Sequence, residues 1–444
     1  MNILTEKSST TLKGTVWRKT CFLSEFSEKA ASAACLMGWL HDRALVPDPT
    51  FGGIVLRITL RDCSGLRDFV VTTKPFIDLL STLEYESVIA IKVLGKEILD
   101  VKILARAKPA IFSPKVITDF STIDLVVHRP LAIRTERMKA VLRVQDQIFT
   151  SARQFFHKEG FCELRPPILS PATDPGIRGA IGADVNFYGK KYKITTSMIL
   201  YKQMAICSLE KVYAFSPNVR LEPVKTRQTG RHLAEFCQID VEQAFINYHD
   251  AMALAERLLV AILSDVKNNC QKELKLLERS LTIPTRPFKK LTFQEALNIL
   301  SKAGFKQLQQ RKELPWEAEK MLSNTFDEPF WVTEFPYGSR GFYDRQDPNR
   351  PAVLRDFDLL YPAGFGEAIS GSEREYLYPQ VKKRMLEQGL PLDEYSWYLD
   401  MLQHGVPPSA GFGLGLERLT RYICGLENIW EATAFPKVPG VHSP

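Results

Sequence analysis

The chain has 444 residues, of which 45% are hydrophobic and 25% charged, and its formal net charge is +7. Such length and composition are typical of a globular protein of about two domains, and they exclude a mainly disordered chain. No apolar run approaches the ~18 residues of a membrane span, and the N-terminus has no apolar signal core, so we expect a cytoplasmic protein. The basic excess is spread along the chain and does not by itself predict nucleic-acid binding.

The eight cysteines stand singly along the chain, with no Cys-x-x-Cys pair. Zinc sites and disulfide frameworks depend on closely or regularly spaced cysteines. We therefore expect reduced thiols and neither kind of site.

The N-terminal part is rich in short β-type runs between residues 30 and 107. The runs lie at 34–39, 53–60, 68–72, 87–94 and 98–104, with a helical stretch at 75–83. Five strands and such a helix are what an OB barrel requires. We predict an N-terminal extension over 1–28, an OB-fold domain over 29–110, a linker over 111–135 and a second domain over 136–444.

Two segments far apart in the sequence could together hold a nucleoside triphosphate. Residues 411–418 read Gly-Phe-Gly-Leu-Gly-Leu-Glu-Arg, a Gly-rich turn leading into a helix, while Arg220-Leu-Glu222 and residues 230–236 lie on predicted paired strands. Arginine binds phosphate through a planar charged fork, glycine allows close backbone approach, and Phe can stack on a purine. Either segment alone is common in proteins without a nucleotide site. Their order, with residues 435–440 closing the pattern, makes chance unlikely.

These segments resemble motifs 3 and 2 of the class II aminoacyl-tRNA synthetases, in the aspartyl/asparaginyl branch. Residues 137–156 have helical apolar spacing, and with the strand predicted after Gly160 they resemble motif 1, which builds the dimer interface in that family. The resemblance implies an α+β fold, in which an OB-fold β-barrel precedes a class II catalytic domain with an antiparallel sheet flanked by helices. It also implies a homodimer, with ATP and Mg²⁺ as cofactors.

The resemblance assigns a role to each residue of the ATP site. Arg220 would contact the α-phosphate, the outer phosphates would meet Arg231, His232 and Arg418, and adenine would lie between Phe236 and Glu222. Arg220 and Arg418 are the predicted catalytic residues, and the ATP set also includes Glu367, Gly413 and Gly415. The predicted Mg²⁺ ligands are Asp358, Glu367 and Ser370, since magnesium prefers oxygen. The alternative for the two acids is ordinary strand-end residues.

The predicted amino-acid side of the site is cationic. Lys202-Gln203 occupies the position where aspartyl enzymes of the branch bind the substrate carboxylate by a lysine, whereas asparaginyl enzymes have an apolar residue and a Glu there. A buried ammonium group without a counter-charge is costly, so Lys202 predicts an anionic substrate, although a solvated surface lysine is the alternative. The predicted substrate-binding residues are Ser197, Lys202, Gln238, Asp240, Gly371 and Arg374.

The OB domain departs from the branch where the anticodon is read. Aspartyl and asparaginyl enzymes usually have a Phe and a Gln there, and this chain has Arg57 and Asp68. Base stacking needs an aromatic platform, so we expect tRNA to be a doubtful partner.

From about Arg134 onward, the sequence most resembles the archaeal asparagine synthetase related to asparaginyl-tRNA synthetase. The segments that carry this resemblance are 170–175, 197–203, 216–222 and 364–374. We therefore expect an ATP-dependent ligase that adenylates aspartate and passes the aspartyl group to ammonia or a small amine. The alternatives are an aspartyl- or asparaginyl-tRNA ligase and a non-catalytic synthetase paralogue that binds RNA. The sequence leaves open which amine is used and which carboxylate is activated.

Overall fold

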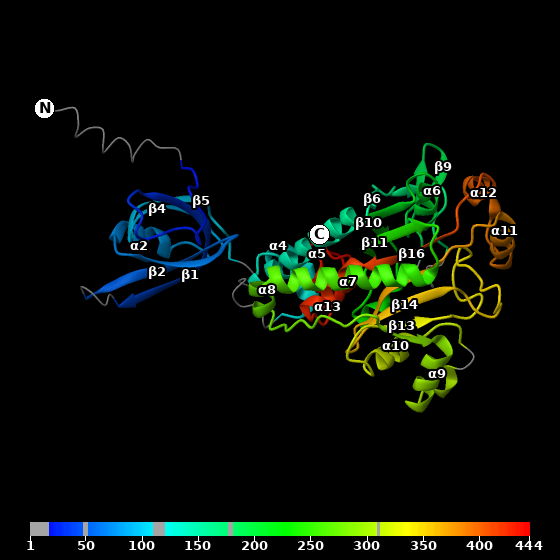
Figure 1. The fold of residues 1–444 in the computed structure, drawn as a ribbon. Coiled ribbons are helices and arrows are strands. Elements are labelled where there is room, and N and C mark those ends of the chain that lie inside the picture. Colours follow the sequence, from blue (N-terminus) through cyan, green and yellow to red (C-terminus); the bar gives the residue numbers. More distant parts are fainter. Residues whose placement is uncertain (1–16, 48–51, 110–119, 176–180, 309–310) are drawn as a thin grey trace. The chain divides into compact units, whose positions relative to one another are not determined.

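The computed structural model describes residues 17–47, 52–109, 120–175, 181–308 and 311–444 (Figure 1). It consists of two compact units, Met1–Phe120 and Ser121–Pro444. Part of the predicted linker, residues 111–119, lies outside the described residues, and its later part carries two short helices of the second unit, α3 (Thr122–Val127) and α4 (Arg129–Ala132).

The first unit is a five-stranded antiparallel sheet with the order β3-β2-β1-β4-β5. Its elements are β1 (Ala34–Pro47), β2 (Ile54–Asp62), β3 (Gly65–Val71), α2 (Lys74–Ser81), β4 (Val88–Leu94) and β5 (Glu97–Ala105). Alternate residues of β2, Leu56, Ile58 and Leu60, are buried in the core of this unit, as the period of a half-buried strand requires. The predicted OB-like fold is confirmed, and β1 continues well beyond its predicted end at residue 39.

Residues before β1 also contribute to this core. Leu23 is 1% exposed and Phe26 is 6% exposed, and both belong to the same apolar cluster as the strands. The Arg67 guanidinium donates to the carbonyl oxygens of Leu23 and Phe26, at 3.2 and 2.6 Å. The described end of the predicted extension therefore packs as part of the barrel.

The second unit is built on an eight-stranded sheet with the order β12-β13-β14-β15-β16-β11-β10-β6. Its strands are β6 (Cys162–Glu163), β10 (Lys211–Val219), β11 (Glu235–Ala244), β12 (Lys289–Thr292), β13 (Phe330–Thr333), β14 (Asp356–Tyr361), β15 (Gly366–Glu373) and β16 (Ser409–Gly415). The pairings are antiparallel except β12 with β13 and β10 with β6. A small sheet of β7 (Leu169–Ser170), β8 (Asp184–Phe187) and β9 (Lys190–Ile194) lies beside α6 (Ile199–Leu209).

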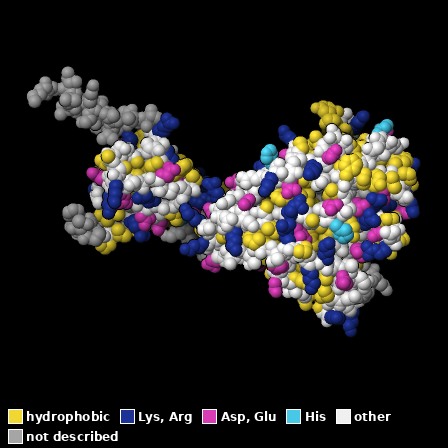
Figure 2. All heavy atoms as spheres, in the orientation of Figure 1, with side chains coloured by type: hydrophobic (Ala, Val, Ile, Leu, Met, Phe, Trp, Pro, Cys, Tyr) yellow, Lys and Arg dark blue, Asp and Glu magenta, His cyan; other side chains and the backbone are white. Residues whose placement is uncertain are grey.

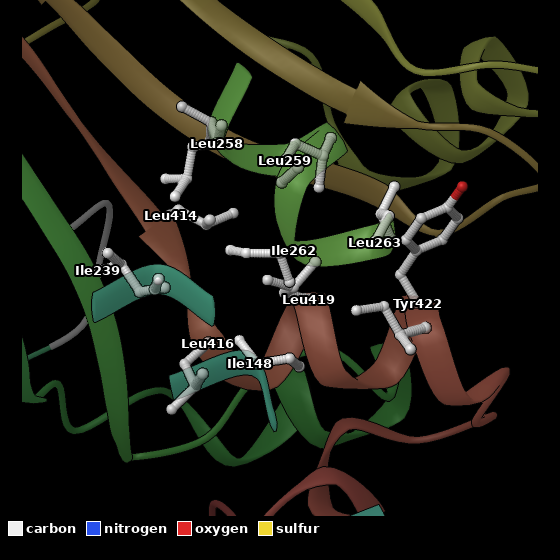
Figure 3. Packing of buried hydrophobic residues seen from close by; sticks show 14 of the residues in the cluster. Ile148, Ile239, Leu258, Leu259, Ile262, Leu263, Leu414, Leu416, Leu419 and Tyr422 are labelled. Carbon is white, nitrogen blue, oxygen red and sulfur yellow. The ribbon is translucent and has the colours of Figure 1, made fainter. Parts of the chain in front are cut away.

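Three helices, α5 (Glu136–Lys158), α7 (Tyr248–Asn269) and α13 (Leu416–Cys424), pack their apolar sides against the sheet. Figure 3 shows Ile262 of α7 among Ile148 of α5, Leu414 of β16 and Leu419 of α13. The predicted motif 1 helix is α5. Its start is fixed by Thr135, whose hydroxyl accepts from the Met138 N–H at 3.1 Å. This core leaves the other face of the central strands for polar side chains.

The remaining elements extend the second unit around the sheet. They are η1 (Val224–Thr229), α8 (Gln271–Leu276), α9 (Phe293–Lys302), η2 (Lys306–Leu308), α10 (Trp316–Ser323), α11 (Tyr378–Glu387), η3 (Leu392–Tyr395), α12 (Ser396–Gln403) and η4 (Ile429–Ala432). Helices α9 and α10 form an apolar cluster with β12 to β14, and α11 and α12 form another with α6. Of the helices that the structure describes, none combines the length and apolar character that crossing a bilayer requires.

The charged side chains are mixed on the surface. Figure 2 shows Lys and Arg spread over the visible face, with Asp and Glu between them. On this face the basic residues are therefore not gathered in one block, in line with their even spread along the sequence.

Candidate active site

The polar ends of the central strands border a cavity of about 630 Å³ in the second unit. Strand β11 alternates between two environments: Ile239 and Val241 lie in the hydrophobic core, while Gln238 and Asp240 line the cavity. The cavity brings together all of the predicted site residues except Asp358: Ser197, Lys202, Arg220, Glu222, Arg231, His232, Phe236, Gln238, Asp240, Glu367, Ser370, Gly371, Arg374, Gly413, Gly415 and Arg418. Segments separated by more than two hundred residues thus form one site.

The Gly-rich segment is a strand, β16, and not the turn that its composition predicted. A Cβ at Gly413 would lie 2.5 Å from Gln238 Nε2, and a Cβ at Gly411 would lie 2.2 Å from both Val241 O and Glu242 Oε2. These glycines therefore leave room for the polar side chains of neighbouring β11, and the helix that carries Arg418 starts directly after the strand.

Arg220 and Glu222 follow the end of β10, and residues 230–234 precede β11, so both groups lie in the connection between paired strands and not on them. The Arg220 Nε donates to Thr196 O at 3.3 Å, and its guanidinium lies 5.3 Å from the centroid of the Phe236 ring. Burial raises the pKa of Glu222 against the opposite effect of Arg220. An arginine, a carboxyl group and an aromatic ring thus occur together at this end of the cavity.

His232 does not supply a fixed positive charge. The pKa of His232 is lowered to about 3, mainly because the ring is buried and in addition because the Arg418 and Arg231 guanidinium groups lie nearby. Its Nδ1 lies 2.8 Å from Thr229 Oγ1. The ring is therefore neutral at pH 7, and the positive charge beside it comes from the arginines.

Lys202 is 2% exposed, which excludes a solvated surface lysine. Its ammonium group donates to Asp240 Oδ1 at 3.1 Å, and to the carbonyl oxygens of Val241 and Phe412 at 3.2 Å each. It also lies 3.6 Å from Glu242 Oε2. An ammonium group has three N–H donors, so this network supplies an acceptor for each.

Arg374 is likewise paired within the protein. Its Nε and Nη2 donate to Glu242 at 3.1 Å each, and its Nη1 donates to Ser372 Oγ at 2.7 Å and to Asp344 Oδ1 at 3.3 Å. Burial alone would lower the pKa of Arg374, but Glu242 and Asp344 raise it. Lys202 and Arg374, the two cations among the predicted substrate-binding residues, are therefore already held by carboxylates of the chain.

Asp358 lies beside the cavity and lines an adjoining small pocket with Glu367 and Arg340. Arg340 Nη2 donates to Asp358 Oδ2 at 2.5 Å, whereas Asp358 Oδ1 is buried without a hydrogen-bond partner among the described residues. Ser370 is directly opposite Asp358 on β15. Glu367 Oε1 accepts from Arg418 Nη1 at 2.9 Å. The three predicted oxygen ligands are thus on adjacent strands.

Several residues of the site were not predicted from the sequence: Asp174, Glu242, Trp316, Glu319, Arg340, Tyr343, Asp344 and Glu417. Glu242 had a usable signal, because it continues the alternate positions of Gln238 and Asp240 on β11. Asp174 and Glu417 lie within segments 170–175 and 411–418, which the sequence analysis singled out without giving these two residues a role. The others come from loops and helices that the tertiary structure brings to the cavity, and their local sequence gives no corresponding pattern.

Comparison with known proteins agrees with this fold. A family model described as class II tRNA synthetases (D, K and N) matches residues 124–439. The chain therefore belongs to the class II aminoacyl-tRNA synthetases. Within that class it fits the aspartyl/asparaginyl branch, because relatives that match most of the chain are asparagine–tRNA ligases.

An asparagine–tRNA ligase of Pelotomaculum thermopropionicum is 31% identical over 92% of this chain and 96% of that protein. One from Koribacter versatilis is 37% identical over 70% of this chain and 72% of that protein. Among solved structures, asparaginyl-tRNA synthetase from Pyrococcus horikoshii, complexed with asparaginyl-adenylate, superposes with a TM-score of 0.89 at 28% identity. That match covers 97% of this chain and 100% of the other.

These findings correct the predicted reaction. Transfer of an aspartyl group to ammonia or a small amine, with tRNA as a doubtful partner, is wrong, because relatives that match nearly the whole chain are asparagine–tRNA ligases. The prediction relied on short segments of the catalytic region and on two substituted positions in the barrel. The match to the P. thermopropionicum ligase covers both units, and it favours the first alternative, tRNA charging. The prediction of a class II synthetase-like ligase is confirmed at the level of the family.

Proposed function

We propose that the chain is an asparagine–tRNA ligase, which joins asparagine to AMP at the expense of ATP and transfers the asparaginyl group to tRNA. The main support is one cavity in which arginines suited to phosphate lie beside a buried polar pocket, formed by Lys202, Arg374 and the carboxylates paired with them. In addition, the chain is similar over nearly its full length to asparagine–tRNA ligases. The class alone would not select the amino acid, so the polar pocket carries that part of the proposal.

The polar pocket supports a neutral substrate side chain. Lys202 and Arg374 are each held by buried carboxylates, with Glu242 shared between them. A substrate carboxylate would have to compete with these internal partners and would add a further buried negative charge, which is costly. An amide adds no charge and can both donate and accept. Asp240 Oδ2, buried without a partner among the described residues, is available to the substrate's α-ammonium group.

On the ATP side, we assign the α-phosphate to Arg220, the outer phosphates to Arg418, Arg231 and neutral His232, and adenine to Phe236 and Glu222. An oxygen of the asparagine α-carboxylate attacks the α-phosphorus, and the bond to pyrophosphate breaks. This carboxylate is already ionised, so the step needs no general base. The 3′-terminal hydroxyl of tRNA then attacks the carbonyl carbon, and AMP leaves. Arginines fixed before the reaction stabilise the charge that develops on the phosphate.

The oxygen ligands present fit a magnesium ion bound together with ATP. Asp358 Oδ1 is buried without a partner in the described part of the chain, and Glu367 and Ser370 follow on the adjacent strand. Magnesium usually takes few ligands from protein and the rest from phosphate and water. Bound at these residues, Mg²⁺ would neutralise phosphate charge. Asp358 is held in position for this role by Arg340.

The outer face of the barrel supports tRNA binding despite the substituted Arg57 and Asp68. Trp39 of β1 is 36% exposed and pairs with Arg61 of β2, whose guanidinium lies 5.5 Å from the centroid of the indole ring. Arg57, Thr59 and Arg61 occupy every second position of β2 and therefore share this face. Asp68 of β3 pairs with Thr59. An exposed indole on this face can stack on a base, which typically contributes ~1–3 kcal/mol.

The domain roles, the homodimer and the cytoplasmic location stay predictions. We assign anticodon binding to the first unit and both chemical steps to the second. The homodimer through the motif 1 region is what the resemblance to the family implies. Sedimentation of the purified chain, which would distinguish a dimer from a monomer, tests this part of the proposal.

The proposed function is tested by two assays on the full-length chain. We expect asparagine to drive ATP–pyrophosphate exchange at least about 10-fold better than aspartate, because Lys202 and Arg374 are already paired with carboxylates of the chain and a second substrate carboxylate would compete with them. We also expect radiolabelled asparagine to become attached to tRNA. Exchange with aspartate but not asparagine would contradict the amino-acid assignment, and amide formation from a free amine without any tRNA charging would contradict the tRNA assignment.

A further inference from the structure

Helix α10 lies outside the segments from which the site was predicted, yet its Trp316 and Glu319 line the cavity. Arg231 Nη1 donates to Glu319 Oε1 at 2.8 Å, and the Arg231 guanidinium lies 4.4 Å from the centroid of the Trp316 ring. Arg231 is 6% exposed and Glu319 is 8% exposed, so water and salt screen their interaction little. Helix α10 therefore fixes the position of one of the phosphate-side arginines.

The same oxygen of Glu319 also holds the strand that carries a predicted metal ligand. The backbone N–H of Glu367 donates to Glu319 Oε1 at 2.6 Å. The Glu367 carboxylate accepts from Arg418 and lies 3.9 Å from Arg231 Nη2. A single carboxylate oxygen thus connects the loop before β11, the start of β15 and, through Glu367, the helix that carries Arg418.

The contact between α10 and the turn joining β14 to β15 is close and specific. Ser323, one turn after Glu319, donates its hydroxyl proton to Tyr361 O at 2.5 Å and accepts from the N–H groups of Gly364 and Gly366 at 3.0 and 3.3 Å. A Cβ at Gly366 would lie 2.4 Å from Glu319 Oε1. The glycine therefore permits the approach of Glu319, and Ser323 anchors the helix that presents it.

We propose that α10 is a positioning element of the ATP site, with Glu319 as its positioning residue. Glu319 holds Arg231 and the backbone of Glu367 in place before ATP and its metal bind, so that the phosphates meet groups that are already oriented. Preorganised charges avoid the reorganisation that mobile side chains undergo on binding. The inference rests on the proposed function, and it gives Glu319 no contact with the reacting atoms.

The test compares full-length Glu319→Ala and Glu319→Gln with Glu317→Ala, which removes an exposed carboxylate from the same first turn of α10. Calorimetry measures the affinity for a magnesium complex of a non-hydrolysable ATP analogue, and pyrophosphate exchange gives the KM for ATP and for asparagine. We expect Glu319→Ala to weaken analogue binding and raise the KM for ATP by about 10-fold or more, since a hydrogen bond to a charged group is lost. The KM for asparagine should change less than about 2-fold.

Glu319→Gln keeps an acceptor for both donors, so it should recover most of the affinity for the analogue, and Glu317→Ala should equal the wild type. Equal effects of Glu319→Ala on ATP and asparagine, or no recovery with glutamine, would overturn the inference and leave Glu319 a general stabilising residue. If Glu319→Ala does not fold, Trp316→Leu, which removes only the ring beside Arg231, must weaken analogue binding selectively. Absence of exchange with any amino acid in the wild type would contradict the proposed function alone, because analogue affinities still compare the variants.

Discussion

Arg220 is placed to act on the phosphate where negative charge develops. It is anchored through Nε to the Thr196 carbonyl, and its side chain is 25% exposed at the cavity. We predict that Arg220→Ala lowers the rate of ATP–pyrophosphate exchange by about 10² or more, as does loss of one preorganised donor in other enzymes. The unfolding midpoint should change little. Arg106→Ala, at an exposed position of the first unit, is the control. Near-normal exchange in a folded Arg220→Ala protein would contradict the assignment.

His232 predicts a pH dependence of stability with a defined sign. Its pKa in the folded protein is about 3, because of burial and the adjacent arginines, compared with about 6.5 in an unfolded chain. Between these values the unfolded state binds the extra proton, so stability falls as pH decreases through this window. His232→Gln should remove up to about 1.4 kcal/mol per pH unit of that slope. Urea unfolding at pH 7, 6 and 5 measures it, with exposed His157→Gln as the control. An unchanged slope would show that His232 is not buried as a neutral ring.

At the scale of elements, the glycines of β16 leave the space that the polar side chains of the neighbouring strand β11 occupy. The Cβ of an alanine at position 411 would lie 2.2 Å from Val241 O, a backbone atom of the neighbouring strand that cannot rotate away. Gly182, by contrast, has no atom within 4 Å of a Cβ among the described residues. We predict that Gly411→Ala lowers the free energy of unfolding by about 1–3 kcal/mol, the usual cost of overpacking. Gly182→Ala should be nearly neutral in the same denaturation assay. Equal stability of both variants would contradict the strand geometry.

At the scale of the whole molecule, each unit has its own apolar core, so the two can be tested separately. We predict that residues 121–444 alone retain asparagine-dependent pyrophosphate exchange within a few-fold of the full chain, because the cavity lies entirely in that unit. Charging of tRNA should fall by at least about 10-fold when the barrel is absent, as a stacking contact worth ~1–3 kcal/mol per base is lost.

Within the full chain, Trp39→Ala should raise the KM for tRNA without affecting exchange. Charging by residues 121–444 at the rate of the full chain would contradict a role of the first unit in tRNA binding.

The sequence by itself determined the family, the barrel strands, helix α5 and part of the residues that line the cavity, because these depend on local patterns. The alternation of Gln238 and Asp240 with apolar residues fixes which side of β11 faces the cavity, whatever lies opposite. The Gly-rich segment was recognised as part of a nucleotide site, although its composition predicted a turn and the sheet made it a strand.

Only the tertiary structure decided how the charges of the site are paired. Lys202 alone predicts an anionic substrate, but folding places Asp240 and Glu242 beside it, and both are about forty residues away in sequence. Arg231 likewise meets Glu319 from a helix that no local pattern connects with ATP. The cost of a buried charge depends on its neighbours in space, and sequence spacing does not record them. For this reason many residues of the site could be predicted from the sequence, whereas the net charge that they offer to the substrate could not.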